Sequence, residues 1–579
     1  MDSSSKPVPS NSDDHDRTNF LPSHEGNYVL PNAPLFSTLL RFAKRSPPRV
    51  VIRDISLGIE RTHADILVDI LVLRRQIQSR LSPETRERLR RSKEVYIAIL
   101  APGGYEYTVA FLAILALGAA AVPLSTHVPV EEAAYLLRKS QSIAILSASS
   151  TETLGTSLET YLRTDGFATF QSVPIWPSLG TSGISDQDFR ISSDLALDEN
   201  SAGVVIFTSG TTGPPKGVVM RRSFVYGYAL SVADHYRLTE NDVILHILPV
   251  HHATGVGISF FPFIVAGACV EFRNGSFDAS WLWERWRAGG LSFFSGVPTI
   301  YMRMMRFYEE KLVALPSQEL DQYISGVRNL RGLLCGSSAL PGPIQNFWYK
   351  IMAGRVILTR YGATEFGAPF KVSLEDKDLP DGSVGRLEVG LDVKLSGGNE
   401  GEILIKSPHM FARYISDDKA TREAHDSDGY FKTGDIARRS GQYYFILGRA
   451  SLDIIKSGGY KISALDIERD ILSLPYVSEV MVVGVSDEEY GQRVAAAITL
   501  RTGQATNRKL SIDELRKDLR GILTGYKLPT LLRIVDGELP KNVSGKVLKK
   551  VLGPQLFPPD YRAIPEVQVW TKQHIVARL

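Results

Sequence analysis

The segment VVIFTSGTTGPPKG, residues 204–217, joins a short apolar run to a loop rich in glycine, proline and hydroxyl side chains. The apolar run predicts a buried strand. The loop offers backbone N–H groups, small hydroxyl donors and the Lys216 ammonium group at one place, and glycine permits the close backbone approach that an enclosed anion requires. We therefore predict a polyphosphate cradle after a strand, with a solvated turn as the weaker alternative. The loop departs from the Walker pattern, because Lys216 follows Gly-Pro-Pro.

Composition sets the outer limits on fold and function. The chain has 579 residues, 44% of them hydrophobic, which predicts more than one domain with large packed cores. A formal net charge of +3, without a basic stretch interleaved with aromatic residues, gives no indication of nucleic acid binding. Cys269 and Cys335 are the only cysteines, which excludes a disulfide framework and a cysteine-rich metal site. A reducing intracellular compartment is therefore expected.

Three segments bear on targeting and on membranes. The polar residues 1–30 lack the apolar core of a signal peptide and predict a disordered tail. The most apolar run, residues 109–124, is shorter than the roughly 20 residues that span a bilayer, so we predict a buried helix leading into a strand, and no membrane span. The last residues, Ala577-Arg578-Leu579, resemble a C-terminal peroxisomal address. A peroxisomal or a cytoplasmic location is therefore expected.

The order of helix-like and strand-like segments predicts an α/β fold. Between about residues 35 and 440 the two kinds alternate, which is typical of mainly parallel sheets flanked by helices. Beyond that region, residues 464–475 and 511–525 predict helices, and residues 477–485 and 494–500 predict strands. We therefore predict a large N-terminal domain at residues 31–448 and a smaller, mobile α+β domain at residues 449–579.

Eight motifs, taken in order, resemble those of the adenylate-forming enzymes: acyl-CoA synthetases, the adenylation domains of peptide synthetases, and luciferases. The motifs are TSGTTGPPKG (208–217), LPVHHATG (248–255), GSSALP (336–341), RYGATE (360–365), GYFKTGD (429–435), GR (448–449), KSGGYKIS (456–463) and PKNVSGK (540–546). The resemblance extends from about residue 35 to 555. It implies an α/β domain that binds ATP and the acyl substrate, a C-terminal lid, and activation of a carboxylic acid to acyl-AMP before transfer to a thiol.

The resemblance also assigns residues to ATP, Mg²⁺ and CoA. Lys216 is expected at the β- and γ-phosphates, Thr364 at the α-phosphate, and Asp435 at the ribose hydroxyls. Glu365 is the expected Mg²⁺ ligand, because that ion takes few protein carboxylates and completes its shell with phosphate oxygens and water. The full predicted nucleotide and CoA set is Thr208, Ser209, Gly210, Thr211, Thr212, Gly213, Lys216, Gly336, Ser337, Ser338, Tyr361, Gly362, Asp435, Arg449, Gly458, Gly459 and Lys461.

Catalysis is expected to involve Lys546, Thr364, Glu365 and His252. Lys546 resembles the family lysine that bridges the carboxylate and the α-phosphate during adenylation, whereas we expect Lys541 to be solvated. His252 is expected to line or gate the acyl and thiol path, and an ordinary structural histidine is the alternative. The lid implies a hinge, but residues 448–453 are one residue longer than the family hinge and lack its charged residue.

Among these families the sequence most resembles the malonyl-CoA synthetases and enzymes like acyl-CoA synthetase family member 3. The guanidinium of Arg360 suits a second carboxylate, which would select a short dicarboxylate such as malonate. The alternative is that Arg360 pairs with a structural acid. Arg303 is a weaker candidate for the same role.

The function that we predict is an ATP-dependent ligase that joins a small carboxylic acid to CoA, with release of AMP and pyrophosphate. A medium-chain, long-chain or polyketide acyl substrate is an alternative. So is an enzyme that loads the thiol of a carrier protein, although no carrier domain is attached and free CoA is favoured. A binding protein without catalysis is disfavoured, because Lys216, Glu365, Asp435, Arg449 and Lys546 are all present.

Overall fold

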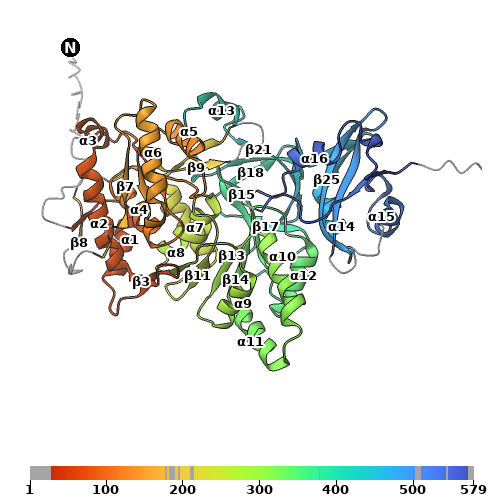
Figure 1. The fold of residues 1–579 in the computed structure, drawn as a ribbon, viewed down its shortest axis with the longest axis horizontal. Helices are drawn as coiled ribbons and strands as arrows, with labels where there is room; N and C mark the ends of the chain where they lie inside the picture. Colours follow the sequence, from red (N-terminus) through yellow and green to blue (C-terminus); the bar gives the residue numbers. More distant parts are fainter. Residues whose placement is uncertain are drawn as a thin grey trace, which may run out of the picture. The chain divides into compact units, whose positions relative to one another are not determined.

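The computed structural model describes residues 28–176, 179–180, 189–193, 196–208, 214–376, 379–501, 510–542 and 545–571 (Figure 1). The chain divides into two compact units. The first comprises the described residues within 1–49, 61–101 and 106–203, and the second those within 50–60, 102–105 and 204–579. The predicted domain boundary at residue 448 therefore lies inside the second unit and stays a prediction.

The first unit is built on a parallel sheet, as predicted. Its strands are β4 (Tyr96–Leu100), β5 (Ala120–Pro123), β6 (Ser142–Ser147) and β7 (Gln171–Pro174), in the order β5-β4-β6-β7. Its helices are α1 (Pro34–Ala43), α2 (His63–Arg80), α3 (Pro83–Arg90), α5 (Val130–Ser140) and α6 (Glu152–Thr164). A separate parallel pair joins β1 (Tyr28–Leu30) to β8 (Phe189–Ile191). The predicted tail is therefore wrong at residues 28–30, which form a strand.

The apolar run at residues 109–124 is buried, as predicted. It supplies most of α4 (Tyr105–Ala116) and all of β5, and nearly every side chain in it is less than 5% exposed. Gly118 makes the turn between helix and strand with φ +84°, a conformation that glycine adopts without strain. Among the described residues, no helix is long and apolar enough to cross a membrane.

The second unit contains a large sheet that changes from parallel to antiparallel at strand β15. Its parallel strands are β2 (Val50–Asp54), β12 (Cys269–Phe272), β11 (Val243–His246), β13 (Phe293–Gly296), β14 (Gly332–Cys335) and β15 (Leu358–Ala363). The antiparallel strands are β16 (Gly367–Lys371), β17 (Ser383–Leu387), β22 (Tyr443–Arg449), β21 (Phe431–Ser440), β19 (Glu400–Lys406) and β18 (Asp392–Leu395). The prediction of mainly parallel sheets thus holds for the first half of this sheet.

Helices of the second unit pack around an aromatic core. Those around the core are α9 (Ala279–Arg287), α10 (Pro298–Phe307), α11 (Ser317–Arg328) and α12 (Gly342–Ile351). The unit also contains α7 (Ala229–His235), α8 (Phe261–Val265) and α13 (Asp418–Glu423). Helices α9, α10 and α12 lie near strands β13 and β14 (Figure 1). Trp283, Trp286 and Trp348 are buried between these elements. Another sheet contains three adjacent strands in the order β20 (Arg413–Tyr414), β10 (Lys216–Arg221) and β9 (Ala202–Thr208). Strand β3 (Ile59–Thr62) ends the large sheet beside β2.

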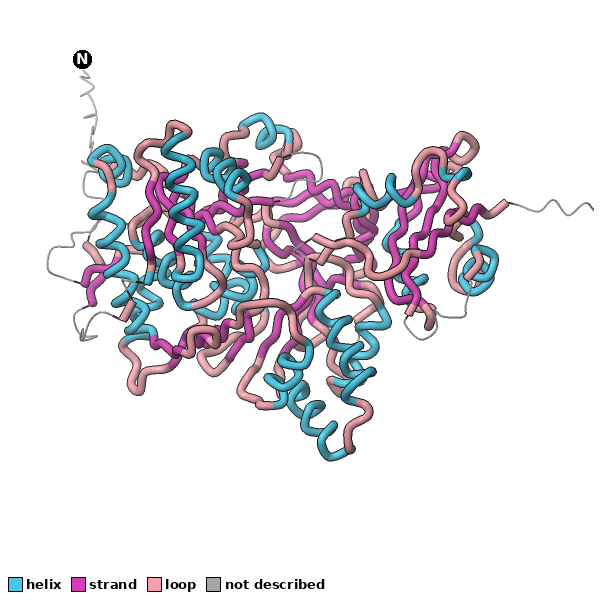
Figure 2. The backbone as a smooth tube through the Cα atoms, in the orientation of Figure 1, coloured by secondary structure: helices cyan, strands magenta, loops and turns pink. Residues whose placement is uncertain are grey.

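Residues 454–569 form a separate sheet (Figure 2), which agrees with the predicted helices and strands. Apolar cores cover both of its faces. Its strands are β23 (Ile454–Ser457), β24 (Tyr460–Ser463), β25 (Val477–Asp487), β26 (Gly491–Leu500), β27 (Leu531–Ile534) and β28 (Val567–Val569). Its helices are α14 (Ala464–Leu472), α15 (Ile512–Leu519) and α16 (Lys549–Leu556). Within β25, Val482 packs with α14 and α15, whereas Met481 and Val483 pack with α16, because successive side chains of a strand point to opposite faces.

Candidate active site

The structure describes both ends of the predicted phosphate cradle. Thr208 ends β9 and Lys216 begins β10, and the Thr208 hydroxyl donates to the Lys216 carbonyl oxygen at 3.3 Å. The loop therefore connects two strands. The predicted cradle residues Ser209, Gly210, Thr211, Thr212 and Gly213 lie outside the described residues.

Lys216 and Glu365 meet through a residue that the motifs do not mark, Tyr414. The Lys216 ammonium nitrogen lies 4.8 Å from the centre of the Tyr414 ring, and the Tyr414 hydroxyl donates to Glu365 Oε1 at 2.8 Å. Burial, together with the nearby Glu365 carboxylate, raises the pKa of Tyr414 above its usual range, so this hydroxyl stays a donor. The cation of the cradle and the predicted metal ligand are thus brought to one place.

Glu365 fits a magnesium ion that arrives with a nucleotide. In the part of the chain that the structure describes, no three His, Cys, Asp or Glu side chains gather as metal ligands. Mg²⁺ commonly binds through one or two protein carboxylates together with substrate phosphates. A single carboxylate beside Lys216 suits that arrangement better than a resident metal held by protein alone.

Asp435, Arg449 and Tyr361 form a second cluster, across the β21–β22 pair. Asp435 lies opposite Arg449 in the register, and Arg449 Nε donates to Asp435 Oδ1 at 2.9 Å. The Tyr361 hydroxyl donates to Oδ2 at 2.8 Å, and burial raises the pKa of Tyr361 well above its usual value. Each carboxylate oxygen has two lone pairs, so Asp435 can still accept bonds from a ligand.

Of two predicted glycines, Gly362 leaves no room for a side chain and Gly336 leaves little. A Cβ at Gly362 would lie 2.0 Å from the Gly367 carbonyl oxygen, and a Cβ at Gly336 would lie 3.1 Å from the guanidinium carbon of Arg360. Ser337 and Ser338, which follow Gly336, are exposed, and Ser337 has φ +72°. Thr364 is half-buried beside Glu365. The predicted nucleotide contacts of these residues stay predictions.

Arg360 is buried on β15, and no described residue serves as its counter-ion. It is 7% exposed, and its Nη1 and Nη2 have no hydrogen-bond partner among the described residues. Three buried tyrosines are close enough to feel its charge: burial raises the pKa of Tyr228, Tyr236 and Tyr301, and Arg360 opposes that rise. The described residues thus offer no structural acid as its partner, which was the alternative to substrate binding.

A buried ion pair lies directly beside Arg360. Lys371 on β16 is opposite Arg360 in the register, and its Nζ lies 2.7 Å from Glu388 Oε2. His235 Nδ1 lies 3.2 Å from the same oxygen. Burial alone would raise the pKa of Glu388, but the hydrogen bond from His235 and the charge of Lys371 bring it down to about 2. Glu388 is therefore ionised and contacts two basic side chains.

Arg303, the second candidate for the acyl site, has a different environment. It lies on α10, is half-exposed, and forms an ion pair with Glu538 at 3.0 Å.

His252 Nε2 is buried and has no hydrogen-bond partner in the described ranges, and burial lowers the pKa of His252. Burial therefore favours the neutral imidazole, and the predicted place of His252 on the acyl and thiol path stays a prediction.

The predicted lid residues lie on two loops. Gly458 and Gly459 make the β23–β24 turn with φ +55° and +84°, and Lys461 is exposed on β24. Lys546 is exposed, and the preceding Gly545 accepts a hydrogen bond from the Thr299 hydroxyl at 3.3 Å. The expectation that Lys541 is solvated is wrong, because its Nζ lies 2.6 Å from buried Glu479.

The long hinge segment contains a buried cluster that sequence reasoning missed. Asp453 accepts the backbone N–H of Arg449 at 3.0 Å and the Lys549 ammonium at 2.7 Å. Lys549 also lies 2.7 Å from Glu468 on α14. We call Asp453, Glu468 and Lys549 the Lys549 cluster. It gives the hinge segment a buried charge at Asp453.

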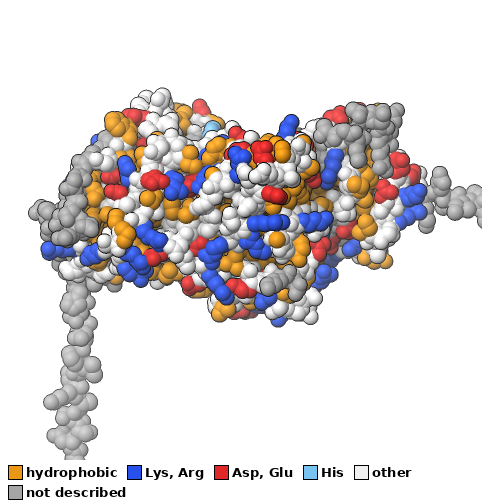
Figure 3. Space-filling view, turned by 90° about the horizontal axis from the view of Figure 1, so that it is seen from below, with side chains coloured by type: hydrophobic (Ala, Val, Ile, Leu, Met, Phe, Trp, Pro, Cys, Tyr) orange, Lys and Arg blue, Asp and Glu red, His pale blue; other side chains and the backbone are white. Residues whose placement is uncertain are grey.

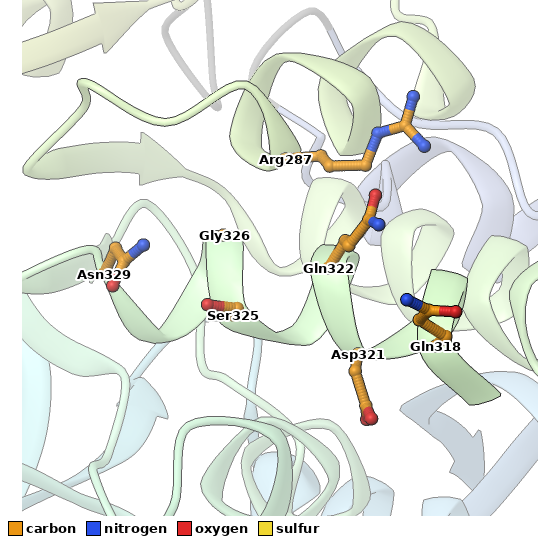
Figure 4. A pocket seen from close by; sticks show the side chains of 7 residues that line it. All are labelled: Arg287, Gln318, Asp321, Gln322, Ser325, Gly326 and Asn329. Atoms are coloured by element: carbon orange, nitrogen blue, oxygen red, sulfur yellow. The ribbon is translucent and has the colours of Figure 1, made fainter.

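A shallow polar pocket on α9 and α11 lies apart from these clusters (Figure 4). Its lining residues are Arg287, Gln318, Asp321, Gln322, Ser325, Gly326 and Asn329. None of the predicted site residues is among them. On the face shown in Figure 3, basic and acidic side chains are interspersed, in keeping with the formal net charge of +3.

Comparisons with known proteins agree with the family resemblance of the motifs. A family described as AMP-binding enzyme matches residues 87–415, and one described as AMP-binding enzyme C-terminal domain matches residues 466–546. A CoA ligase of Gibberella moniliformis is 34% identical over 529 residues, which cover 80% of this chain and 85% of that protein. A malonate–CoA ligase of Xenopus laevis, described as mitochondrial, is 34% identical over 499 residues, which cover 80% of this chain and 83% of that protein.

The fold has solved counterparts as well. The ATP-bound crystal structure of MatB from Rhodopseudomonas palustris superposes with a TM-score of 0.75 over 92% of this chain and all of that one, at 23% identity. These relatives give no support to a peroxisomal location, and residues 577–579 lie outside the described ranges. The chain belongs to the AMP-binding enzyme family and is an AMP-forming acyl-CoA ligase.

Proposed function

We propose that this ligase activates a short dicarboxylic acid, with malonate as the leading candidate. The reaction would join one carboxylate to the α-phosphate of ATP, release pyrophosphate, and then pass the acyl group to the CoA thiol with release of AMP. The second carboxylate would stay unreacted and bind to Arg360. The buried guanidinium of Arg360, without a counter-ion among the described residues, is the observation that carries this proposal.

A buried charge without a partner is costly, so its retention needs a reason. Moving an ion from water into a protein interior costs roughly several kcal/mol, even after the surrounding groups have relaxed. Buried charges in proteins are therefore normally paired. Arg360 presents a planar fork of N–H donors that matches a carboxylate in two parallel hydrogen bonds. An anionic substrate would therefore supply the missing partner.

The charges around Arg360 point the same way. Arg360 and Lys371 are two buried cations on paired strands, and Glu388 is the one carboxylate bound to either of them among the described residues. The region therefore carries an excess positive charge, which favours a dianionic acid over a monocarboxylate of similar size. The similarity to a malonate–CoA ligase of Xenopus laevis supports the same substrate class.

A substrate screen tests the proposal directly. The purified enzyme with ATP, Mg²⁺ and CoA is offered malonate, methylmalonate, acetate, hexanoate, a long-chain fatty acid or an aryl acid, and pyrophosphate release is measured. We expect malonate or methylmalonate to give the highest kcat/KM. A preference for hexanoate or the longer acids would support the medium-chain, long-chain or polyketide alternative. Pyrophosphate release without a thioester on free CoA would support the alternative in which the acyl group is loaded onto the thiol of a carrier protein.

Replacing Arg360 tests the anchor itself. In Arg360→Leu the second carboxylate would lose its partner, at a cost of roughly 2–5 kcal/mol, or about 30- to 4,000-fold in kcat/KM for malonate. Butyrate should lose little or gain. Arg303→Leu is the matched control, because Arg303 already pairs with Glu538. If Arg303→Leu shows the malonate-selective loss instead, Arg360 is not the anchor.

The remaining site residues receive their roles as part of the proposal. Lys216 would neutralise the β- and γ-phosphates, and Asp435 would accept the ribose hydroxyls. Mg²⁺ held by Glu365 would neutralise phosphate charge when bound. Lys546 would bridge the attacking carboxylate and the α-phosphate, which calls for a movable lid that first presents Lys546 and later the Gly458–Gly459 turn.

Separate assays of the two half-reactions test the role of Lys546. Removing a cation that stabilises the transition state costs about 10²- to 10³-fold in rate. Lys546→Ala should therefore suppress adenylation to that extent, yet leave thioester formation from supplied acyl-AMP nearly intact. Gly459→Val should show the opposite pattern, because a side chain there would obstruct the thiol route. Equal losses in both half-reactions for both variants would contradict an alternating lid.

A further inference from the structure

Arg360 has a carboxylate close by that it does not bind. Lys371 lies opposite Arg360 in the β15–β16 pair, and Lys371 holds Glu388 at 2.7 Å. Arg360 and Glu388 both act on the pKa of Tyr228 and of Tyr236, in opposite directions, although burial is the main cause of those shifts. The two charges thus share the same surroundings, yet no ion pair joins them in the structure described.

Glu388 is restrained by its own contacts. Its Oε2 faces both Lys371 Nζ and His235 Nδ1, while its Oε1 accepts from the Ser231 hydroxyl at 3.4 Å. Its backbone N–H donates to the Pro369 carbonyl at 2.8 Å. Lys371 is itself 2% exposed, so solvent has little access to the Lys371–Glu388 ion pair.

We propose that Lys371 and His235 are specificity-determining positioning residues, which hold the Glu388 carboxylate away from Arg360 and so keep Arg360 free for the acid substrate. This inference rests on the proposed dicarboxylate function. A buried carboxylate that loses its own cation is attracted to the next one, because Coulomb interactions are strong in a low-dielectric interior. Without Lys371, Glu388 would pair with Arg360, and the second carboxylate of the substrate would meet a neutralised site.

The test compares Lys371→Met with the double variant Lys371→Met/Glu388→Gln. We expect Lys371→Met to lower kcat/KM for malonate by about tenfold or more while butyrate falls much less, since pairing with Glu388 removes the anion site. In the double variant a neutral amide replaces the competing carboxylate, so the malonate preference should return. A purely structural ion pair predicts that malonate and butyrate fall together, and that the double variant recovers no preference.

His235→Leu provides a milder variant in case Lys371→Met does not fold. It removes one of the two contacts to Glu388 Oε2 and leaves Lys371 in place. We expect the ratio of malonate to butyrate kcat/KM to fall in the same direction, by less. Lys371→Arg, which keeps the cation, should retain most of the wild-type ratio. An unchanged ratio in His235→Leu, or a lost ratio in Lys371→Arg with normal folding, would overturn the inference.

The outcomes separate this inference from the proposed function. If the wild-type enzyme prefers butyrate, or if Arg360→Leu affects both acids equally, the proposed function is wrong and Lys371 has no anion site to protect. If the wild-type enzyme prefers malonate and Arg360→Leu abolishes that preference, the proposed function stands. In that case an unaltered preference in Lys371→Met would contradict only the positioning role of Lys371 and His235.

Discussion

Two buried cations in the second unit have opposite surroundings. Lys549 is 8% exposed and lies 2.7 Å from each of two carboxylates, Asp453 and Glu468. Arg360 is 7% exposed and has no counter-ion among the described residues. A cation that is fully paired behaves as part of the framework, whereas a cation kept unpaired lowers stability and indicates a binding role.

The pKa values of the two buried lysines, Lys549 and Lys371, follow the number of carboxylates that each one contacts. Burial would lower the pKa of Lys549, but the charges of Glu468 and Asp453 raise it above its ordinary value. Lys371 has one carboxylate, and there burial, with a further contribution from Arg360, keeps its pKa below the ordinary value. One carboxylate is thus insufficient to compensate burial at Lys371, and two are sufficient at Lys549.

The strongest test of this comparison is Lys549→Met. It leaves two buried carboxylates without their cation, which should lower the free energy of unfolding by about 3–5 kcal/mol in denaturant titrations. Lys546→Met, three positions earlier and exposed, is the control and should change stability by no more than about 0.5 kcal/mol. Similar small effects for both variants would mean that the Lys549 cluster is not part of the framework.

Arg360→Met should have the opposite sign. Removing a buried, unpaired charge while keeping a long apolar side chain should raise the free energy of unfolding by about 1 kcal/mol or more. The same titrations measure it, alongside the loss of malonate activity. A destabilisation close to that of Lys549→Met would show that Arg360 stabilises the fold through a partner and would remove the distinction between the two sites.

Tyr414→Phe tests a smaller contribution, at the contact between Lys216 and Glu365. The ring would remain under Lys216, and only the hydrogen bond to Glu365 would be lost. A loss of about 1 kcal/mol corresponds to about fivefold in the adenylation rate, measured as pyrophosphate release. Tyr430→Phe, whose hydroxyl donates to Asp392 at 2.7 Å, is a matched control that should leave this rate unchanged.

Buried histidines differ from both buried cations, because burial keeps the imidazole neutral. Burial lowers the pKa of His63 and of His246 to about 4 from an ordinary value of 6.5. The unfolded chain therefore binds more protons below pH 6.5, so the stability from each histidine is complete above that pH and is lost as pH falls towards 4. Between pH 7 and pH 6 the loss is roughly 0.7 kcal/mol for each histidine.

Unfolding titrations across this range check the sign. His246→Gln should fold with lower overall stability but a shallower pH dependence, because one of the buried histidines with a lowered pKa is removed. A stability that increases as pH falls from 7 to 5 would contradict neutral buried histidines.

The sequence predicted those features that local patterns encode. The order of strands and helices indicated the α/β class. The family resemblance of the motifs pointed to Glu365, Asp435 and Arg449, whose roles stay predictions, and the last two pair across β21 and β22. Lys371 could not be recognised, because its burial arises from pairing with β15 and not from its neighbours in the chain. Tyr414 likewise reaches Glu365 from 49 positions away, in a segment without a motif.

Strand direction was the main limit on predicting the fold. Alternating segments predict parallel strands when helices connect them, and this holds as far as β15. From β16 to β22 the strands of this sheet turn antiparallel, and α13 is the one helix in the described connections between them. The hinge was missed for a related reason, since the burial of Asp453 depends on Lys549, which is 96 positions away.

Strand β15 constrains how this enzyme can change during evolution. Arg360 and Tyr361 are adjacent, so their side chains lie on opposite faces of the sheet, one next to the buried tyrosines and the other bonded to Asp435. A substitution at position 360 would alter the proposed acid anchor and leave the Tyr361 contact in place. An insertion or deletion of one residue within the strand would exchange the two faces and lose both contacts at once. New substrate preferences should therefore arise in this lineage by substitution at position 360, while the length of β15 stays fixed.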